Sequence, residues 1–98
     1  MQLRSPLISH DPLRFTLLIM IPEIDYDAPD PPHRQIASWL RDQITSGELQ
    51  PGRKIPSEGD LVGMFGVART TARRAVALLR DEGWVTTTAG RGSYVAKR

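Results

Sequence analysis

The stretch that decides the fold runs from residue 57 to residue 83 and reads SEGDLVGMFGVARTTARRAVALLRDEG. Its first residue, Ser57, stands three positions before Asp60, which is the spacing of a helix capping box with aspartate in place of the preferred glutamate. A short helix is therefore predicted at about 58–65. Its inward-facing side chains are predicted to be Leu61, Val62 and Phe65.

Gly66 interrupts this helical pattern, and glycine readily adopts the positive φ that other residues resist. A second helix is predicted from about residue 69 to residue 82, because Ala72, Val76 and Leu79 recur on one face. Gly83 then stands where a glycine commonly ends a helix. Two helices joined by a glycine turn predict a helix-turn-helix.

The residues before this stretch predict one more helix, at about 33–46. Ile36, Leu40 and Ile44 recur every four residues and form an apolar stripe. Prolines precede this segment and Gly47 follows it, as is typical of helix boundaries. Between the helices, residues 53–55 are expected to form a brief strand before Pro56 ends it.

The residues after the stretch predict a β-hairpin. Residues 84–88 are rich in β-branched and aromatic side chains, residues 93–95 resemble their partner strand, and a glycine-rich loop joins the two. The predicted fold is therefore mainly α with a small β-hairpin: a winged helix-turn-helix of three helices plus a wing.

The N-terminal part of the chain is predicted to be different. Residues 1–32 hold six prolines, which remove amide donors and restrict the residues before them. We expect residues 1–25 to form an irregular N-terminal arm with a tendency to disorder, and residues 26–98 to form the winged helix-turn-helix domain.

Charge is distributed unevenly along the chain. The formal net charge is +2, but residues 1–51 hold four basic and seven acidic side chains (−3), whereas residues 52–98 hold nine basic and four acidic ones (+5). This asymmetry favours a polyanionic partner for the second half. The longest apolar stretch, seven residues at 15–21, is too short to span a membrane.

The start of the helix predicted at 69–82 is rich in side chains that can contact DNA. Arginine can donate two hydrogen bonds to guanine, and threonine can contact a phosphate or a thymine methyl group. Basic side chains at a helix N-terminus oppose the helix dipole, which suggests that a partner supplies the negative charge. The side chains concerned are Arg69, Thr70, Thr71, Arg73 and Arg74.

For any one of these arginines, an ordinary solvated helix face is the competing interpretation. Arg91 is a further candidate, since a basic side chain at a hairpin tip can enter the minor groove. Its competing interpretation is an exposed arginine in a mobile loop.

Other function classes find little support in the residues. The chain has no cysteine, which excludes disulfides and thiol nucleophiles and suits the cytoplasm, and its two histidines lack the spacing of a metal motif. Residues 90–92 form a lone G-x-G without the third glycine of a dinucleotide site. We expect no catalytic residues, no metal and no cofactor.

Taken together, the motifs resemble the DNA-binding domain of the GntR family of bacterial transcription regulators over about residues 26–95. IPSE at 55–58, FGVARTTARRA at 65–75, EGWV at 82–85 and GRGSYV at 90–95 carry most of the resemblance. Further matching positions are 35–37, 40–41, 44, 47, 49, 51–52, 61 and 78–79.

The resemblance implies a regulator, commonly a repressor, that binds a pseudo-palindromic operator in double-stranded DNA as a homodimer. It implies base and phosphate contacts from the arginines and threonines named above, a wing tip at Gly90 and Arg91, and a small residue, Ser57, at the start of the second helix. Three positions depart from the family pattern: Gly59 replaces a basic DNA contact, Ala68 replaces a capping serine or threonine, and His33 stands where a tyrosine is usual.

Family members usually continue into a domain that binds a small-molecule effector and holds the dimer together. Because this chain stops three residues after the hairpin, we expect a stand-alone short member without an effector domain. The alternative hypothesis is a winged-helix protein-interaction module whose arginines meet an acidic protein. Only phosphate contacts would impose a log-linear loss of affinity with salt on many unrelated duplexes.

Overall fold

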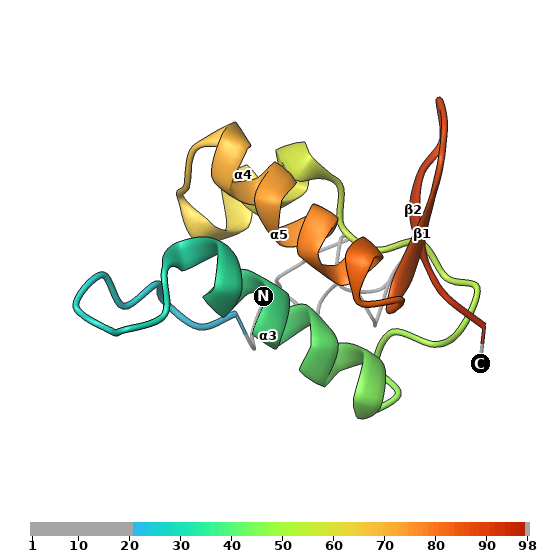
Figure 1. Ribbon diagram of the computed structural model, residues 1–98, viewed down its shortest axis with the longest axis horizontal. Coiled ribbons are helices and arrows are strands. Elements are labelled where there is room, and N and C mark those ends of the chain that lie inside the picture. Colours follow the sequence, from blue (N-terminus) through green and yellow to red (C-terminus); the bar gives the residue numbers. More distant parts are fainter. Residues whose placement is uncertain (1–20, 98) are drawn as a thin grey trace, which may run out of the picture.

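The computed structural model describes residues 21–97, and the first 20 residues of the predicted arm lie outside this range. Within it, three helices precede a two-stranded antiparallel hairpin that projects at one end of the molecule (Figure 1). The elements are α3 (Pro32–Thr45), α4 (Glu58–Phe65), α5 (Arg69–Asp81), β1 (Val85–Thr88) and β2 (Gly92–Val95). The predicted winged helix-turn-helix is confirmed.

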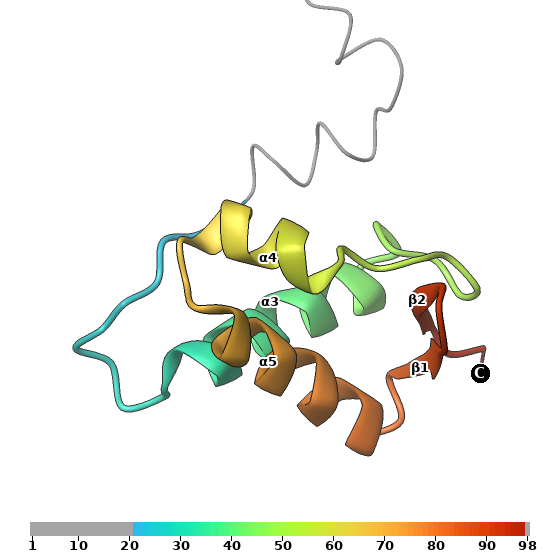
Figure 2. The same cartoon turned by 90° about the horizontal axis from the view of Figure 1, so that it is seen from above.

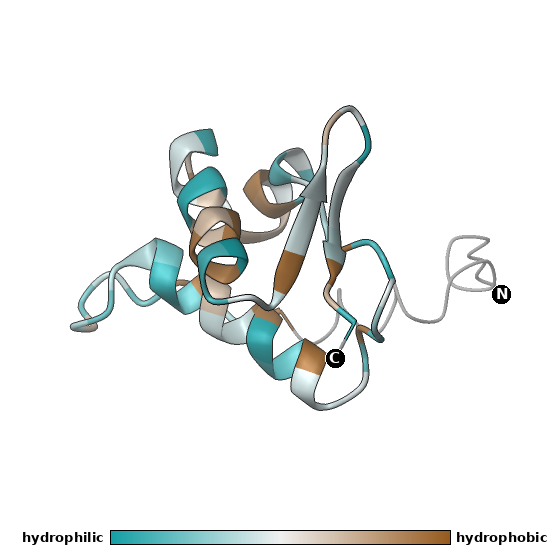
Figure 3. Ribbon diagram, turned by 45° about the vertical axis from the view of Figure 1, so that its right-hand side comes forward, coloured by the Kyte–Doolittle hydropathy of each residue, from teal (hydrophilic) through white to brown (hydrophobic). Residues whose placement is uncertain are grey.

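One apolar core joins the three helices to the base of the hairpin. The view in Figure 2 shows α3, α4 and α5 packed beside one another, and Trp39 of α3 meets Phe65 of α4 edge to face at a centroid distance of 5.5 Å. Hydrophobic residues gather where the helices face each other and at the strand bases, whereas most of the hairpin above its base is pale or hydrophilic (Figure 3). At the periphery, Arg41 Nη1 donates to Glu82 Oε1 at 2.8 Å and ties α3 to the end of α5.

The predicted capping box at the start of α4 is confirmed. The Asp60 amide donates to Ser57 Oγ at 3.0 Å, and the Ser57 amide donates to Asp60 Oδ2 at 3.1 Å. At the other end, Gly66 has φ 66° and ψ 36°, and its amide donates to the Val62 carbonyl. A side chain at this left-handed position would be strained, so glycine is what permits the tight turn into α5.

Helix α5 begins without a side-chain cap. Its N-cap residue is Ala68, at φ −68° and ψ 154°, the extended conformation in which serine normally caps a helix. We expect Ala68→Ser to raise the free energy of unfolding by about 1 kcal/mol, measured by urea denaturation. As a control, Ala77→Ser inside α5 should lower it by about 0.5 kcal/mol. Equal effects at both positions would contradict the capping argument.

The wing is the hairpin of β1, β2 and the loop between them. Its register pairs Val85 with Val95 and Thr88 with Gly92. The brief strand predicted at residues 53–55 is reduced to a single bridge, between Lys54 and Tyr94, flanked by hydrogen bonds from the Ile55 amide to Ser93 and from the Val95 amide to Arg53. The first predicted strand begins one residue late, at Val85.

The buried face of α3 includes a polar residue at its C-terminal end. Ile44 continues the predicted apolar stripe and packs half-buried against the core, and Gln43 beside it is 4% exposed. The chain turns back after α3, and the Leu49 amide donates to the Gln43 carbonyl at 2.9 Å. This turn brings Leu49 over the helix beside Gln43, which lies seven residues after Ile36 and so on the same, buried face of α3.

The described part of the arm is attached to the helices. Ile21 and Ile24 pack against the core. Gln35 accepts a hydrogen bond from the Asp25 amide and donates to the carbonyls of Asp25 and Asp30. The division between arm and domain at residue 26 stays a prediction. Across residues 21–97, no helix is both long and apolar enough to cross a membrane.

Candidate nucleic-acid interface

The first turns of α5 present a basic, largely exposed surface. The side chains of Arg69 and Arg73 are 61% and 59% exposed, and their four-residue spacing places them on one face of the helix. Thr70 and Arg74 form a neighbouring exposed row, whereas Thr71 is half-buried. The first turn of α5 contains no acidic residue, so the positive charges reinforce the positive end of the helix dipole.

Ser57 lies at the start of α4 and close to this surface. A Cβ atom built at Gly59 would lie 3.8 Å from Ser57 Oγ and 3.6 Å from Arg69 Nη2, so these two side chains border the same point. Within the capping box the Ser57 hydroxyl acts as an acceptor. Its own proton can therefore be donated to a phosphate oxygen.

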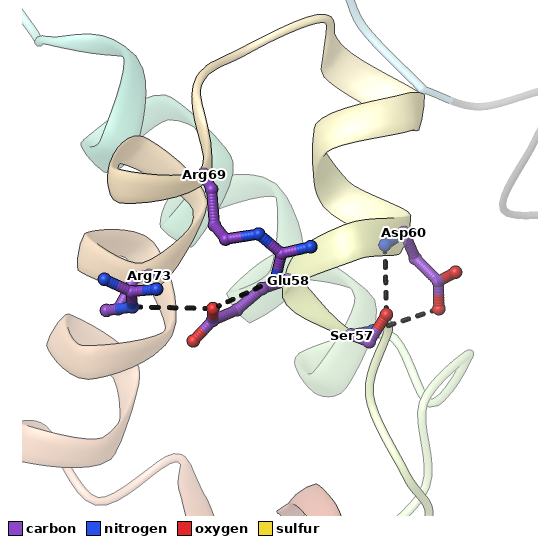
Figure 4. A network of polar contacts seen from close by, with 5 residues as sticks. All are labelled: Ser57, Glu58, Asp60, Arg69 and Arg73. Carbon is purple, nitrogen blue, oxygen red and sulfur yellow. Dashed lines mark hydrogen bonds and ion pairs between the residues drawn. The ribbon is translucent and has the colours of Figure 1, made fainter.

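Glu58 lies between the two α5 arginines, a feature that sequence reasoning missed. One of its oxygens, Oε1, is 3.6 Å from Arg69 Nη1 and 3.5 Å from Arg73 Nε (Figure 4). The carboxylate belongs to α4 and both guanidinium groups to α5, so the packing of the two helices creates the contact. Sequence inspection assigned residue 58 only to the family motif.

The wing carries the remaining predicted residues, Gly90 and Arg91. Both are exposed, Gly90 has φ 76°, and the Arg91 amide donates to the Thr88 carbonyl at 3.0 Å. The structure therefore places Arg91 in the turn between β1 and β2.

Two further basic residues lie at the wing and were not predicted. Lys54 lies beside Gly92, where an added Cβ would come within 2.7 Å of Lys54 Cε; the φ of Gly92, 126°, also favours glycine. Arg80 Nη1 donates to Thr87 Oγ1 at 3.3 Å, and Thr87 Oγ1 is 2.9 Å from Ser93 Oγ. Lys54 and Arg80 thus add two basic side chains next to the strands of the wing.

The part of the chain that the structure describes offers no group of three or more His, Cys, Asp or Glu side chains able to hold a metal ion. The arrangement is instead one of exposed hydrogen-bond donors and positive charge. Such donors can contact phosphate oxygens and the acceptor atoms of base edges.

Comparison with known proteins agrees with this geometry. Residues 32–95 match the family described as "Bacterial regulatory proteins, gntR family". The HTH-type transcriptional repressor NagR of Bacillus subtilis is 40% identical over 74 residues, covering 76% of this chain and 30% of NagR. The chain therefore spans less than a third of the length of this relative.

Solved structures resemble the fold closely. AraR(DBD) in complex with operator ORX1 superposes with a TM-score of 0.71 at 30% identity, covering 78% of this chain and 96% of that one. YtrA from Sulfolobus acidocaldarius, a GntR-family transcription factor, superposes with a TM-score of 0.73 at 36% identity, covering 80% of this chain and 82% of that one.

Proposed function

The chain belongs to the gntR family of bacterial regulatory proteins, and from that premise we propose that it is a sequence-specific DNA-binding transcription regulator. The observation that carries the proposal is the pair of exposed arginines, Arg69 and Arg73, on one face at the start of α5. The second helix of a helix-turn-helix enters the major groove with its N-terminal residues at the base edges.

Each predicted residue has a role in this proposal. Arg69 and Arg73 contact base edges, with guanine as the best acceptor. Arg91 at the wing tip enters the adjacent minor groove, with Gly90 allowing the close approach. The remaining side chains bind phosphates and fix the register of the protein on the duplex: Ser57, Thr70, Thr71 and Arg74.

The operator and the assembly follow from the same proposal. A helix-turn-helix protein commonly binds as a dimer, with operator symmetry that mirrors the two-fold axis of the protein. We propose a homodimer on a pseudo-palindromic operator, acting in the cytoplasm without catalytic activity. NagR is named a repressor, which favours repression here.

The test is a fluorescence-anisotropy titration with the promoter upstream of the chain's own gene and with a scrambled duplex, at two salt concentrations. At the higher salt we expect the chain to bind the promoter more tightly than the scrambled duplex, because base contacts persist while phosphate contacts weaken. Equal binding that disappears with salt would contradict sequence-specific regulation. Binding to an acidic protein without that salt dependence would favour the protein-interaction alternative.

A further inference from the structure

Glu58 contacts both Arg69 and Arg73, and each contact uses only part of the arginine's guanidinium group. The contact to Arg73 uses Nε, and the contact to Arg69 uses Nη1 (Figure 4). A guanidinium has five N–H donors in a rigid fork. The contact to Arg73 therefore does not use the terminal nitrogens that suit guanine, whereas the contact to Arg69 uses one of them and leaves Nη2.

These contacts are weak enough to yield to DNA. They are 3.5 and 3.6 Å long, and the side chain of Glu58 is itself 32% exposed. Exposed ion pairs of this kind change an equilibrium by less than about tenfold. They can nevertheless orient two long side chains that would otherwise sample many rotamers, and ordering such side chains is one of the costs of binding.

We propose that Glu58 is a specificity-determining positioning residue: its carboxylate holds Arg69 and Arg73 toward the base edges and penalises binding to DNA that offers only phosphates. On non-specific DNA the carboxylate offsets part of the arginine charge and repels nearby phosphates. At the operator, guanine N7 and O6 supply acceptors that compensate for the weak ion pairs. The inference rests on the proposed function, since it concerns the same two arginines.

The test compares Glu58→Gln with Asp81→Asn in the full chain. Both variants remove one negative charge from the protein, but Asp81 is exposed at the far end of α5, away from the two arginines. Affinity is measured for a duplex that the wild-type chain selects from a random pool and for a scrambled duplex, over a range of salt. Thermal unfolding reports whether each variant folds.

We expect E58Q to bind the scrambled duplex about three- to tenfold more tightly than wild type, which is the scale of two exposed ion pairs. Its affinity for the selected duplex should change less than twofold, so the specificity ratio falls. The salt slope on the scrambled duplex should steepen by roughly one phosphate contact, about 0.9 in log–log units. D81N should leave the ratio unchanged.

Equal gains in E58Q and D81N would overturn the inference, because they would reflect net charge alone. If E58Q does not fold, Glu58→Asp keeps the charge but withdraws the carboxylate, and an undiminished specificity ratio would then overturn the positioning role. A wild-type chain that selects no sequence would overturn the proposed function itself. The scrambled-duplex comparison of E58Q with D81N would still decide whether Glu58 restrains the arginines.

Discussion

Replacing Arg69 or Arg73 with alanine is expected to weaken operator binding by roughly five- to 150-fold. A well-placed bidentate arginine–guanine contact contributes about 1–3 kcal/mol of discrimination, and every 1.4 kcal/mol is about tenfold in affinity. The fold should remain intact, because both side chains are more than half exposed and surface substitutions usually change stability by less than about 0.5 kcal/mol. Anisotropy titrations with operator and scrambled duplexes measure the effect.

Arg34→Ala is the matched control, since it removes the same charge from an exposed position on α3. It should lower affinity for both duplexes slightly and equally. If Arg69→Ala or Arg73→Ala lowers the affinity for both duplexes to the same extent, the arginine contacts phosphates only. Loss of helicity in the circular dichroism spectrum would instead indicate a structural role.

Replacing Leu79 with alanine is expected to lower the free energy of unfolding by about 2–5 kcal/mol. Leu79 is 0% exposed in the core that holds α5 against α3, and its carbonyl accepts a hydrogen bond from the Trp84 amide where the chain enters the wing. A domain of this size has about 5–15 kcal/mol of stability at most, and small domains lie at the lower end. Urea denaturation followed by circular dichroism measures the loss.

Leu78→Ala provides the comparison within the same helix, because Leu78 is only half-buried. Leu78→Ala should lower the free energy of unfolding clearly less than Leu79→Ala does. Equal costs would mean that the packing of α5 does not depend on the buried face described here. DNA affinity of Leu79→Ala should approach that of wild type at temperatures where the variant remains folded, because Leu79 is buried away from the interface.

Most of the fold could be predicted because its signals are local. The capping box joins Ser57 and Asp60, and the turn depends on the conformational freedom of Gly66. Both are decided within a few residues of chain, so the predicted ends of the helices agree with the structure to within one residue. The burial of Gln43 had no signal in the apolar pattern, because the fold-back that covers it depends on where Leu49 packs.

In the candidate site, too, some residues could be predicted from local sequence and others could not. Arg69, Arg73 and Arg91 are evident from composition and from their places after a glycine turn and in a glycine-rich loop. Lys54 and Arg80 gave no such signal, because nothing near them in sequence places them at the wing. Their contacts with Gly92 and Thr87 exist only because α5 and residues 53–55 both pack against the hairpin.

By itself, the sequence determined the order of elements, their caps and turns, the family and the basic start of α5, since each depends on neighbouring residues. Only the tertiary structure decided that Glu58 would lie between Arg69 and Arg73. That contact joins two helices, and its geometry depends on how their buried faces pack rather than on residue spacing. Helix packing is set by the whole core, and so the arrangement of charges at this surface was not readable from the chain.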